Sequence, residues 1–234
     1  MFRKKTFCTL TMLIFLGIPC LSAGDTATFV DLGFSPDGKT YMFGQYGVQS
    51  ETLKPWANLF IVDVVRNNFV SSGRSSFVNE RPVVSGQDGS GALYRLIAQN
   101  AALAARYNID YCFQGQPLFI SLDTKPASPP RPIEFRDFES GAQYRASLVS
   151  QVEGSGVSLR SSFYIDLERT ARDGSRKTYR VGTPQLKRQM ISDYHIRKVM
   201  IAPRDGSMIF VIEMIVQDSR RNFDVRYMVE AVRL

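Results

Sequence analysis

The feature that most constrains the fold is a series of short apolar segments, each bounded by turn residues. In the last of them, residues 223–232, apolar and polar side chains alternate, with Phe223, Val225 and Tyr227 on one side of the chain. An alternation with a period of two residues is typical of a β-strand that has one face in a core. The opposite face of such a strand meets water, as in many antiparallel sheets. The segment therefore predicts an antiparallel strand with one polar, exposed face.

Similar segments recur along the chain, and together they predict a mainly β fold of the α+β class. Gly, Pro, Asp and Asn separate them, and these residues favour turns because they preset or tolerate the backbone angles that turns need. The predicted strands cover residues 28–34, 40–43, 59–65, 118–122, 133–138, 143–152, 157–167, 177–181, 208–216 and 223–232. We expect an antiparallel sheet, in a sandwich or a partial propeller-like architecture.

One stretch, between Ser90 and Tyr107, has the period of a helix instead. Its apolar residues recur at intervals of three and four positions, which places them on one face of a helix. Asp88 or Ser90 is a candidate N-cap, and Asn108 is typical of a helix end. This is the one clear helix that the sequence predicts, and we expect it to cover one face of a sheet.

Three other segments have weaker patterns. Residues 71–91 are polar and rich in Ser and Gly, which predicts a loop. Residues 125–132 are rich in Pro, which predicts a stiff, extended connector inside one domain. Residues 185–192 predict a short basic helix. We expect one β-rich domain over residues 24–234, in which the apolar strands near the two ends of the chain share one sheet.

Residues 1–23 have the composition of a secretory signal peptide. A basic start at residues 3–5 precedes an apolar run over residues 7–18, and small residues follow before Gly24. The apolar run is shorter than the roughly 20 residues that a membrane-spanning helix needs. We predict a mature chain that begins near Gly24 and is secreted or periplasmic. A lipid anchor at Cys20 is an alternative that stays open.

Removal of this leader changes the charge and the cysteine content. The formal net charge falls from +7 to +4, because the leader holds three basic residues and no acidic one. A small, dispersed excess of this kind argues against nucleic-acid binding, which uses clustered Lys and Arg. Cys112 is the one cysteine left, so a monomer has no internal disulfide and its core must hold the fold. No later segment has the length of a membrane-spanning helix.

Few residues of the mature chain are typical catalytic or metal-binding groups. His195 is the one histidine, and because no Cys or carboxylate lies at the spacing of a zinc site we expect a structural or exposed role for it. Cys112 lies between two aromatic residues, which predicts a small apolar residue rather than a nucleophile. We expect no catalytic, cofactor-binding or metal-binding residue, and no cofactor. Cys112→Ser and His195→Ala are accordingly expected to leave function intact.

Glycines, turn aspartates and one basic stretch are the other candidates. Gly86, Gly89 and Gly91 precede the helix without the Lys of a phosphate-binding loop, which predicts a flexible loop. Aspartates in predicted turns are expected to accept backbone hydrogen bonds, and they are Asp31, Asp37, Asp63, Asp205 and Asp218. The basic stretch over residues 187–198 predicts a solvated face, with contact to anionic lipid or cell wall as the alternative.

Two stretches, from Phe34 to Lys39 and from Ile201 to Gly206, combine a Pro with an Asp-Gly pair and lead into apolar strands. Each resembles one blade of the propeller repeats in periplasmic TolB-like proteins, although no copies with a period of about 40 residues lie between them. The layout of a leader, the first stretch, residues 43–49 and the closing strand pair resembles a bacterial family of predicted secreted proteins, a domain of unknown function. The resemblance implies an exported protein and carries over no catalytic residue.

These observations predict an exported protein that is not an enzyme and that acts as a binding or envelope-accessory module. We expect a protein or peptide partner in the cell envelope, recognised by strand addition at an exposed sheet edge. The alternative is a hydrolase that acts on envelope polymers through paired carboxylates, which needs no histidine. Two carboxylates facing each other in a deep cleft favour the hydrolase, and an exposed apolar surface favours binding. The oligomeric state is not predicted.

Overall fold

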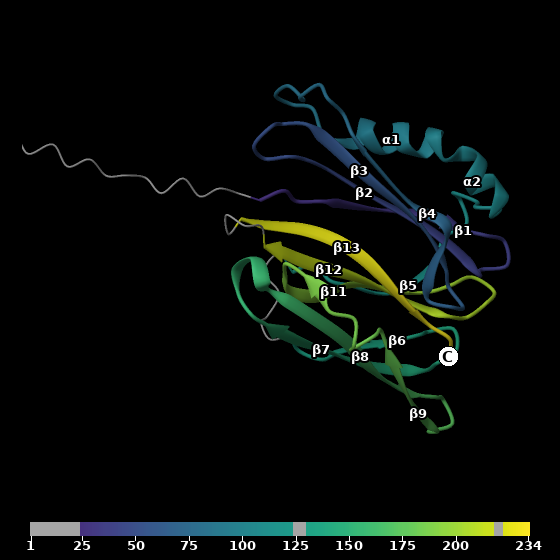
Figure 1. The fold of residues 1–234 in the computed structure, drawn as a ribbon. Helices are drawn as coiled ribbons and strands as arrows, with labels where there is room; N and C mark the ends of the chain where they lie inside the picture. Colours follow the sequence, from purple (N-terminus) through teal and green to yellow (C-terminus); the bar gives the residue numbers. More distant parts are fainter. Residues whose placement is uncertain (1–23, 124–129, 218–221) are drawn as a thin grey trace, which may run out of the picture.

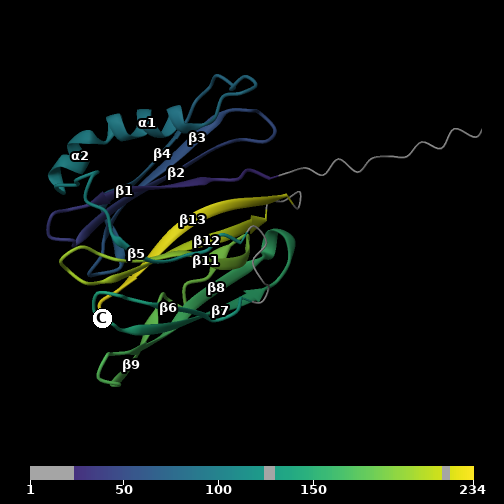
Figure 2. The same ribbon diagram turned by 180° about the vertical axis from the view of Figure 1, so that it is seen from behind.

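The chain forms three antiparallel β-sheets stacked face to face, with helices on the outer face of the first sheet (Figure 1; Figure 2). The computed structural model describes residues 24–123, 130–217 and 222–234. The mainly β, antiparallel fold with one clear helix is therefore confirmed, and the stacked sheets match a sandwich among the predicted architectures. The predicted leader, Asp218 and most of the proline-rich connector lie outside the described residues.

The first sheet is a four-stranded meander. Its strands are β1 (Thr28–Phe34), β2 (Thr40–Val48), β3 (Pro55–Asp63) and β4 (Asn68–Val78), and each pairs with the next. β4 covers the start of the segment over residues 71–91, so the loop predicted there is wrong for that part. The reason is that β4 is an edge strand with mostly exposed side chains. Its pairing with β3 relies on backbone hydrogen bonds and needs no apolar period.

Two helices cover the outer face of this sheet, where the sequence predicts one. α1 (Ser90–Gln99) and α2 (Ala101–Arg106) are separated at Asn100, whose side-chain Nδ2 donates to the Leu96 carbonyl at 2.8 Å. Asn108 follows α2 with a positive φ of 52°, as expected of a helix end. The helix contributes to a core with the first sheet, which contains Ala92, Leu93, Leu96, Met42, Leu59 and Ile61.

The second sheet is the middle layer of the molecule (Figure 1). It has the order β13–β12–β11–β5 and consists of β5 (Gln116–Ile120), β11 (Ile191–Ile201), β12 (Met208–Gln217) and β13 (Phe223–Val232). The exposed polar face predicted for the last strand is wrong, because Glu230 is 5% exposed and Met228 packs against a core shared with the third sheet. A middle layer is covered on both faces, so neither side of β13 is left fully to water.

The third sheet covers the other face of the middle layer. Its order is β10 (Arg188–Gln189), β8 (Arg160–Thr170), β7 (Gln143–Glu153) and β6 (Ile133–Arg136), and β9 (Arg176–Val181) also pairs with β8. The 3-10 turn η1 (Gly156–Ser158) joins β7 to β8. The short basic helix predicted over residues 185–192 is wrong. Arg188–Gln189 pairs with the start of β8, and Ile191 already belongs to β11.

The strands near the two ends of the chain meet face to face and not within one sheet, so their predicted pairing is wrong. β4 supplies the partner that the opening strands need. β13 instead contributes Val229 and Ala231 to a core with aromatic residues of the first sheet, namely Phe34, Tyr41 and Phe43. The rings of Phe34 and Tyr41 stack there with 4.4 Å between their centroids. The contact therefore depends mainly on side-chain packing, and the backbones meet only at an isolated parallel bridge, where Thr26 pairs with Val225 and the Ala27 N–H donates to the Val225 carbonyl at 3.1 Å.

The two turns that resemble propeller blades lie against each other. A Cβ atom on Gly38 would lie 1.9 Å from the Pro203 carbonyl oxygen, and the φ of Gly38 is +74°, so glycine is required at this contact. The meander of the first sheet has the strand order of one propeller blade. The sheets are nevertheless stacked on one another and not arranged around a channel (Figure 1).

Candidate functional site

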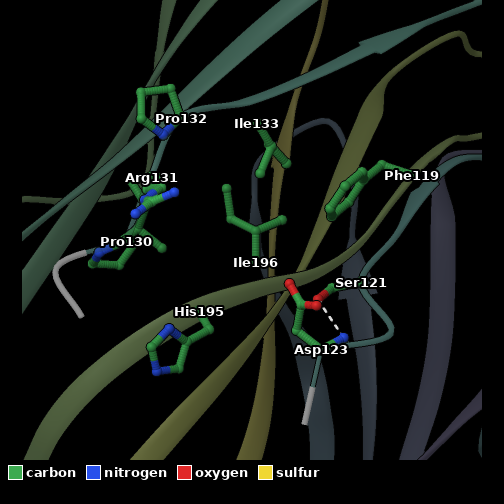
Figure 3. Close-up of a pocket in the computed structure, with 10 residues that line it drawn as sticks. Phe119, Ser121, Asp123, Pro130, Arg131, Pro132, Ile133, His195 and Ile196 are labelled. Carbon is green, nitrogen blue, oxygen red and sulfur yellow. Dashed lines mark hydrogen bonds between the residues drawn. The ribbon is translucent and has the colours of Figure 1, made fainter. Parts of the chain in front are cut away.

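A cavity of about 420 Å³ lies between the middle sheet and the third sheet (Figure 3). The end of β5 and part of β11 supply one wall, and β7 together with the start of β6 supplies the other. The lining is largely apolar with a few polar side chains, and consists of Phe119, Ser121, Asp123, Pro130, Arg131, Pro132, Ile133, Leu148, His195 and Ile196. The volume lies within the roughly 300–1,000 Å³ that is typical of small-molecule pockets.

His195 reaches the cavity from a part of β11 that is bounded by irregular pairing. The register with β12 shifts just before Asp193 and again just after Ile196. Shifts of this kind change the direction of side chains along a strand and are common beside functional sites. Because β11 also lies in the middle layer, the three successive residues 194–196 are all buried.

The imidazole ring of His195 is held through one of its two nitrogens. Its side chain is 8% exposed, and Nε2 lies 3.3 Å from Oδ2 of Asp193. Asp193 Oδ1 accepts the Tyr194 backbone N–H at 2.8 Å, which orients the carboxylate. His195 Nδ1 is buried and has no hydrogen-bond partner among the described residues. Figure 3 shows a ring nitrogen of His195 directed toward the part of the cavity beside Pro130 and Arg131.

Charged side chains of opposite sign stand at different places around the cavity. Figure 3 shows Arg131 on the same side as His195, and Asp123 on the opposite side. The Asp123 backbone is fixed, because its N–H donates to Ser121 Oγ at 3.4 Å and its carbonyl accepts a hydrogen bond from Arg197 Nη1. A molecule in the cavity would therefore meet a guanidinium, an imidazole and a carboxylate around an apolar wall.

This arrangement suits hydrogen bonding to a ligand better than a reaction. With the neutral ring's proton on Nε2, facing Asp193, Nδ1 is an acceptor that needs a donor. Because Nδ1 has no described partner, Ser121 does not form a serine–histidine pair with it. Asp123 is the one carboxylate among the lining residues, whereas a paired-carboxylate hydrolase needs two. Within residues 24–123, 130–217 and 222–234, no group of three or more His, Cys, Asp or Glu residues could hold a metal ion.

A second buried polar cluster joins all three sheets beside a cavity of about 410 Å³. Glu230 Oε1 of β13 lies 3.2 Å from Arg188 Nη2 of β10. Asn67, in the β3–β4 turn, donates from Nδ2 to Glu230 Oε2 at 2.5 Å and accepts the Ala231 N–H on Oδ1 at 2.7 Å. Burial raises the pKa of Glu230 above its ordinary value. Because these contacts link sheets to one another, we interpret this cluster as structural.

The turn aspartates have the predicted role wherever the structure describes them. Asp37 Oδ1 accepts the Ser35 hydroxyl at 2.6 Å and the Lys39 N–H at 3.1 Å, and these hydrogen bonds lower the pKa of Asp37. Other aspartates that accept a backbone N–H nearby are Asp31, Asp63 and Asp205. Cys112 is exposed, before β5. Its expected lack of a functional role stays a prediction.

The basic stretch over residues 187–198 is a solvated face only at its start, where the Lys187 side chain is 54% exposed, so that prediction is wrong for the rest of the stretch. Lys198 Nζ lies 2.9 Å from Asp31 Oδ2, and the Lys198 side chain is 22% exposed. Arg197 Nε lies 3.2 Å from Glu213 Oε2, and its side chain is 24% exposed. The physical reason is that β11 lies in the middle layer, where a charged side chain needs an ionic or hydrogen-bonded partner.

Sequence reasoning singled out His195 but missed the residues around it. Arg131 and Asp123 come from different segments, which only the stacking of two sheets brings to one cavity. Asp193 could have been found, because residues two apart on a strand lie on the same face and a carboxylate near a histidine is a common pair. The sequence instead indicated a structural or exposed role for the histidine, because β11 was not predicted and no Cys or carboxylate was recognised at the spacing of a zinc site.

The fold defines a mainly β protein of stacked antiparallel sheets, with a partly apolar cavity between two of them. The chain belongs to the family described as Predicted secreted protein (DUF2259), whose sequence profile matches residues 42–233. The resemblance to a family of predicted secreted proteins, inferred from the overall layout, is thereby confirmed. A search of the curated proteins found no match to this chain. No helix in the described part of the chain is long and apolar enough to cross a membrane.

Proposed function

We propose that this chain is an exported binding protein, not an enzyme, and that the cavity beside His195 holds its ligand. The buried Nδ1 of His195 carries the proposal, which replaces the expectation from the sequence that His195→Ala leaves function intact. A buried polar atom without a partner costs about 1–3 kcal/mol, and a ligand that donates a hydrogen bond to it offsets this cost. The apolar part of the lining would add to affinity by burying apolar ligand surface. The description of the family as secreted supports export.

The proposal includes removal of residues 1–23 and a mature start near Gly24, in the periplasm or outside the cell. It is supported by hydrogen bonds that fix the chain to β13 directly after the predicted cleavage site. The Asp25 N–H donates to Asp224 Oδ1 at 2.7 Å, and the Val225 N–H donates to the Asp25 carbonyl at 2.8 Å. N-terminal sequencing and the mass of the native protein test this part. An intact leader would contradict it, and a lipid on Cys20 would indicate the anchored alternative.

Recognition by strand addition has weaker support than recognition in the cavity. β4 is an exposed edge strand, but its register with β3 shifts between Phe60 and Val62, and it carries Arg74. Irregular pairing and charged side chains are features that oppose the addition of a further strand. The cavity instead combines an apolar lining with a buried acceptor, so we place ligand recognition there.

The hydrolase alternative has one buried candidate acid, and the two carboxylates that do share a cavity are both exposed. A carboxyl that acts as a general acid near neutral pH needs a raised pKa, and burial gives Glu230 one. Glu230 is, however, already bound to Arg188 and Asn67, and it is the one carboxylate among the residues that line its cavity. Neither of these two cavities therefore has two carboxylates in its lining. Two carboxylates, Glu134 and Glu168, line a third cavity of about 530 Å³, but both are exposed, and Glu134 Oε1 lies 3.6 Å from Arg145 Nη1.

Nuclear magnetic resonance of the imidazole tests the proposal, because His195 is the one histidine of the chain and gives one set of ring signals. We expect a low-molecular-weight extract of cells that make the protein to shift these signals in a saturable way, with no component consumed. The fluorescence of Trp56, the one tryptophan, reports whether the fold is kept. Consumption of a component in proportion to protein concentration would indicate an enzyme. Ring signals that no extract shifts would contradict a ligand in this cavity.

A further inference from the structure

We propose that one end of the molecule docks on the surface of a phospholipid bilayer through apolar side chains in the connections between its strands. This end contains Gly24, the first described residue, and is called the Gly24 end below; it lies on the left in Figure 1 and on the right in Figure 2. Three observations carry the proposal. Large apolar side chains are exposed there on separate connections, hydrogen bonds join several of these connections, and the lysines beside them are paired with carboxylates.

Five connections at the Gly24 end are β2–β3, β4–α1, β5–β6, β7–β8 and β12–β13 (Figure 1). Each of them, or the strand residue beside it, carries a large apolar side chain that is between 51% and 88% exposed, and these are Leu53, Val84, Leu122, Val157 and Phe223. At the opposite end, the described connections β1–β2, β8–β9 and β11–β12 carry none. Single exposed apolar residues are common, but several gathered at one end mark an interaction surface.

The backbone at Leu53 shows that its side chain is not placed there for the fold. Its φ is +54°, in the left-handed region that favours Gly or Asn and disfavours a bulky residue. The side chain is 51% exposed, so its burial in the fold offsets little of this cost. Residues held in such a conformation are common at functional sites. The position therefore favours a contact of the leucine side chain outside the folded chain.

Hydrogen bonds join several connections of the Gly24 end to one another. The Val83 N–H donates to the Leu53 carbonyl at 2.8 Å, which joins the β4–α1 and β2–β3 connections. The Ser50 N–H donates to Asp25 Oδ1 at 2.6 Å, and the Asp25 carbonyl accepts the Val225 N–H of β13. Connections that are ordered before docking lose little conformational entropy when they bind. The apolar side chains on them are therefore already placed for a common surface.

The charges beside these side chains favour a neutral bilayer over an anionic one. Lys54 Nζ lies 2.6 Å from Glu80 Oε2, and Lys187 Nζ lies 2.6 Å from Glu153 Oε2. Anionic lipids attract clusters of basic residues, whereas apolar insertion requires no net charge. A bilayer also accepts apolar side chains scattered over a wide end, whereas a protein partner needs a matching pocket for each of its main anchors. We therefore assign the Gly24 end to zwitterionic phospholipid.

The place where the described chain begins also fits a bilayer. Cys20 precedes Gly24 by four positions, and four residues span at most about 14 Å. A lipid on Cys20, the alternative that stays open, would therefore hold the Gly24 end against the bilayer. Docking through the apolar side chains requires no such lipid, so the experiment is designed to exclude its contribution.

The experiment is flotation of the exported full chain with phosphatidylcholine vesicles. The chain carries Cys20→Ser, which removes the site of a lipid anchor. We expect the protein to float with the vesicles to the same extent at low and at high salt, because apolar insertion is not screened by ions. Binding that requires anionic lipid and is lost at high salt would overturn the proposal, and so would the absence of binding.

Two variants assign the binding to the Gly24 end. Leu122→Ser and Leu53→Asn are each expected to weaken vesicle binding about tenfold, since each removes a large apolar side chain from the docked surface. Asparagine tolerates the left-handed backbone at position 53, so this change keeps the fold. The matched control is Phe138→Ser, which changes a side chain that is 85% exposed in the β6–β7 connection at the opposite end. Trp56 fluorescence shows that each variant is folded.

The outcomes separate a bilayer from a protein partner and from the proposed function. Equal weakening by Phe138→Ser and Leu122→Ser would overturn the assignment to the Gly24 end. Self-association of the wild type that Leu53→Asn abolishes, without vesicle binding, would identify an interface between two copies and overturn the bilayer. The shift of the His195 ring signals by cell extract is expected to persist in Leu53→Asn, so a failure of vesicle binding leaves the cavity ligand untouched.

Discussion

Apart from the isolated bridge between Thr26 and Val225, single side chains connect the stacked sheets of this protein. Asn67 has a positive φ of 50°, which places its side chain in reach of β13 from the β3–β4 turn. Its amide nitrogen donates a hydrogen bond to Glu230, and its amide oxygen accepts one from the Ala231 N–H. An asparagine suits this position because it tolerates the left-handed backbone and offers both a donor and an acceptor.

Asn67→Gly is expected to lower the free energy of unfolding by about 2 kcal/mol, because it leaves two buried polar groups without a partner. Glycine tolerates the backbone conformation, so the change reports the side chain alone. Urea unfolding measures the effect. The adjacent change Asn68→Ala, at an exposed position, is expected to shift the free energy of unfolding by less than about 0.5 kcal/mol. Equal effects of the two changes would contradict the linking role of Asn67.

Glu230 gives a pH dependence of defined sign. Burial raises the pKa of this carboxyl above its ordinary 4.5, so the folded state holds the proton more tightly than the unfolded chain does. Its contribution to stability is present below the ordinary pKa and is lost as pH rises through the raised one. Relative to Glu230→Gln, the wild type is therefore expected to lose free energy of unfolding as pH rises above the ordinary pKa of 4.5 and through the raised one. Urea unfolding at each pH measures this difference, and a relative gain of the wild type would contradict it.

Local sequence patterns predicted the role of a residue well where its hydrogen-bond partner is close in sequence. Asp37 and Asp63 could be assigned to turns because a short side chain beside a turn bonds the backbone within a few residues. His195 could not be assigned to the cavity in this way. Arg131 and Asp123 lie more than 60 positions away along the chain and reach it only after two sheets have stacked.

At the scale of elements, α1 is fixed on the first sheet through a close backbone contact. A Cβ atom on Gly89, the N-cap residue, would lie 2.3 Å from the Gly47 carbonyl oxygen of β2. Gly91 is two residues further on, and a Cβ atom there would meet nothing within 4 Å. The glycines predicted to form a flexible loop therefore differ from one another, and Gly89 is required for packing.

The same substitution at these two positions is expected to have opposite effects. Gly89→Ala forces the helix away from β2 and is expected to lower the free energy of unfolding by more than about 1 kcal/mol. Gly91→Ala, inside α1 and in open space, is expected to raise it by about 0.5–1 kcal/mol through the better helix propensity of alanine. Chemical unfolding of both variants measures this. A destabilising Gly91→Ala, or a neutral Gly89→Ala, would contradict the docking geometry.

Elements with a clear period were predicted, and those stabilised by non-local contacts were missed. β12 and β13 could be predicted from their apolar residues and from the turn residues that bound them. β11 has no such pattern, because its charged residues are partly buried and pair with carboxylates of other strands, and a local pattern contains no sign of such distant partners. β4 was missed for the opposite reason, since an edge strand needs few apolar residues.

At the scale of the whole molecule, the middle sheet separates two cores. Tyr227 of β13 packs with the first sheet, and Met228, the next residue, packs toward the third. The sequence predicts strands with apolar faces, but it does not say which faces meet, because stacking depends on contacts between residues far apart in the chain. The prediction that strands near the two ends of the chain contact each other is therefore confirmed, and the prediction that they lie in one sheet is wrong.

We propose that residues 24–234 fold as one cooperative domain, and truncation tests this. Deletion of residues 223–234 removes side chains from both cores and is expected to abolish cooperative unfolding of the whole chain, as measured by hydrogen exchange. Phe223→Ser, which changes a side chain that is 55% exposed, is the control and is expected to keep the fold. A truncated chain with a protected, cooperatively melting first sheet would show that the sheets form separate domains.

The central claim is that the cavity beside His195 holds a small ligand. Native mass spectrometry tests it most directly, on protein purified without denaturation from cells that export it. We predict a wild-type chain that carries an additional small-molecule mass, a His195→Gln variant that has lost this mass while remaining folded, and an Arg136→Gln variant that retains it. A ligand-free wild type, or a bound mass that His195→Gln retains to the same extent as the wild type, would contradict the account.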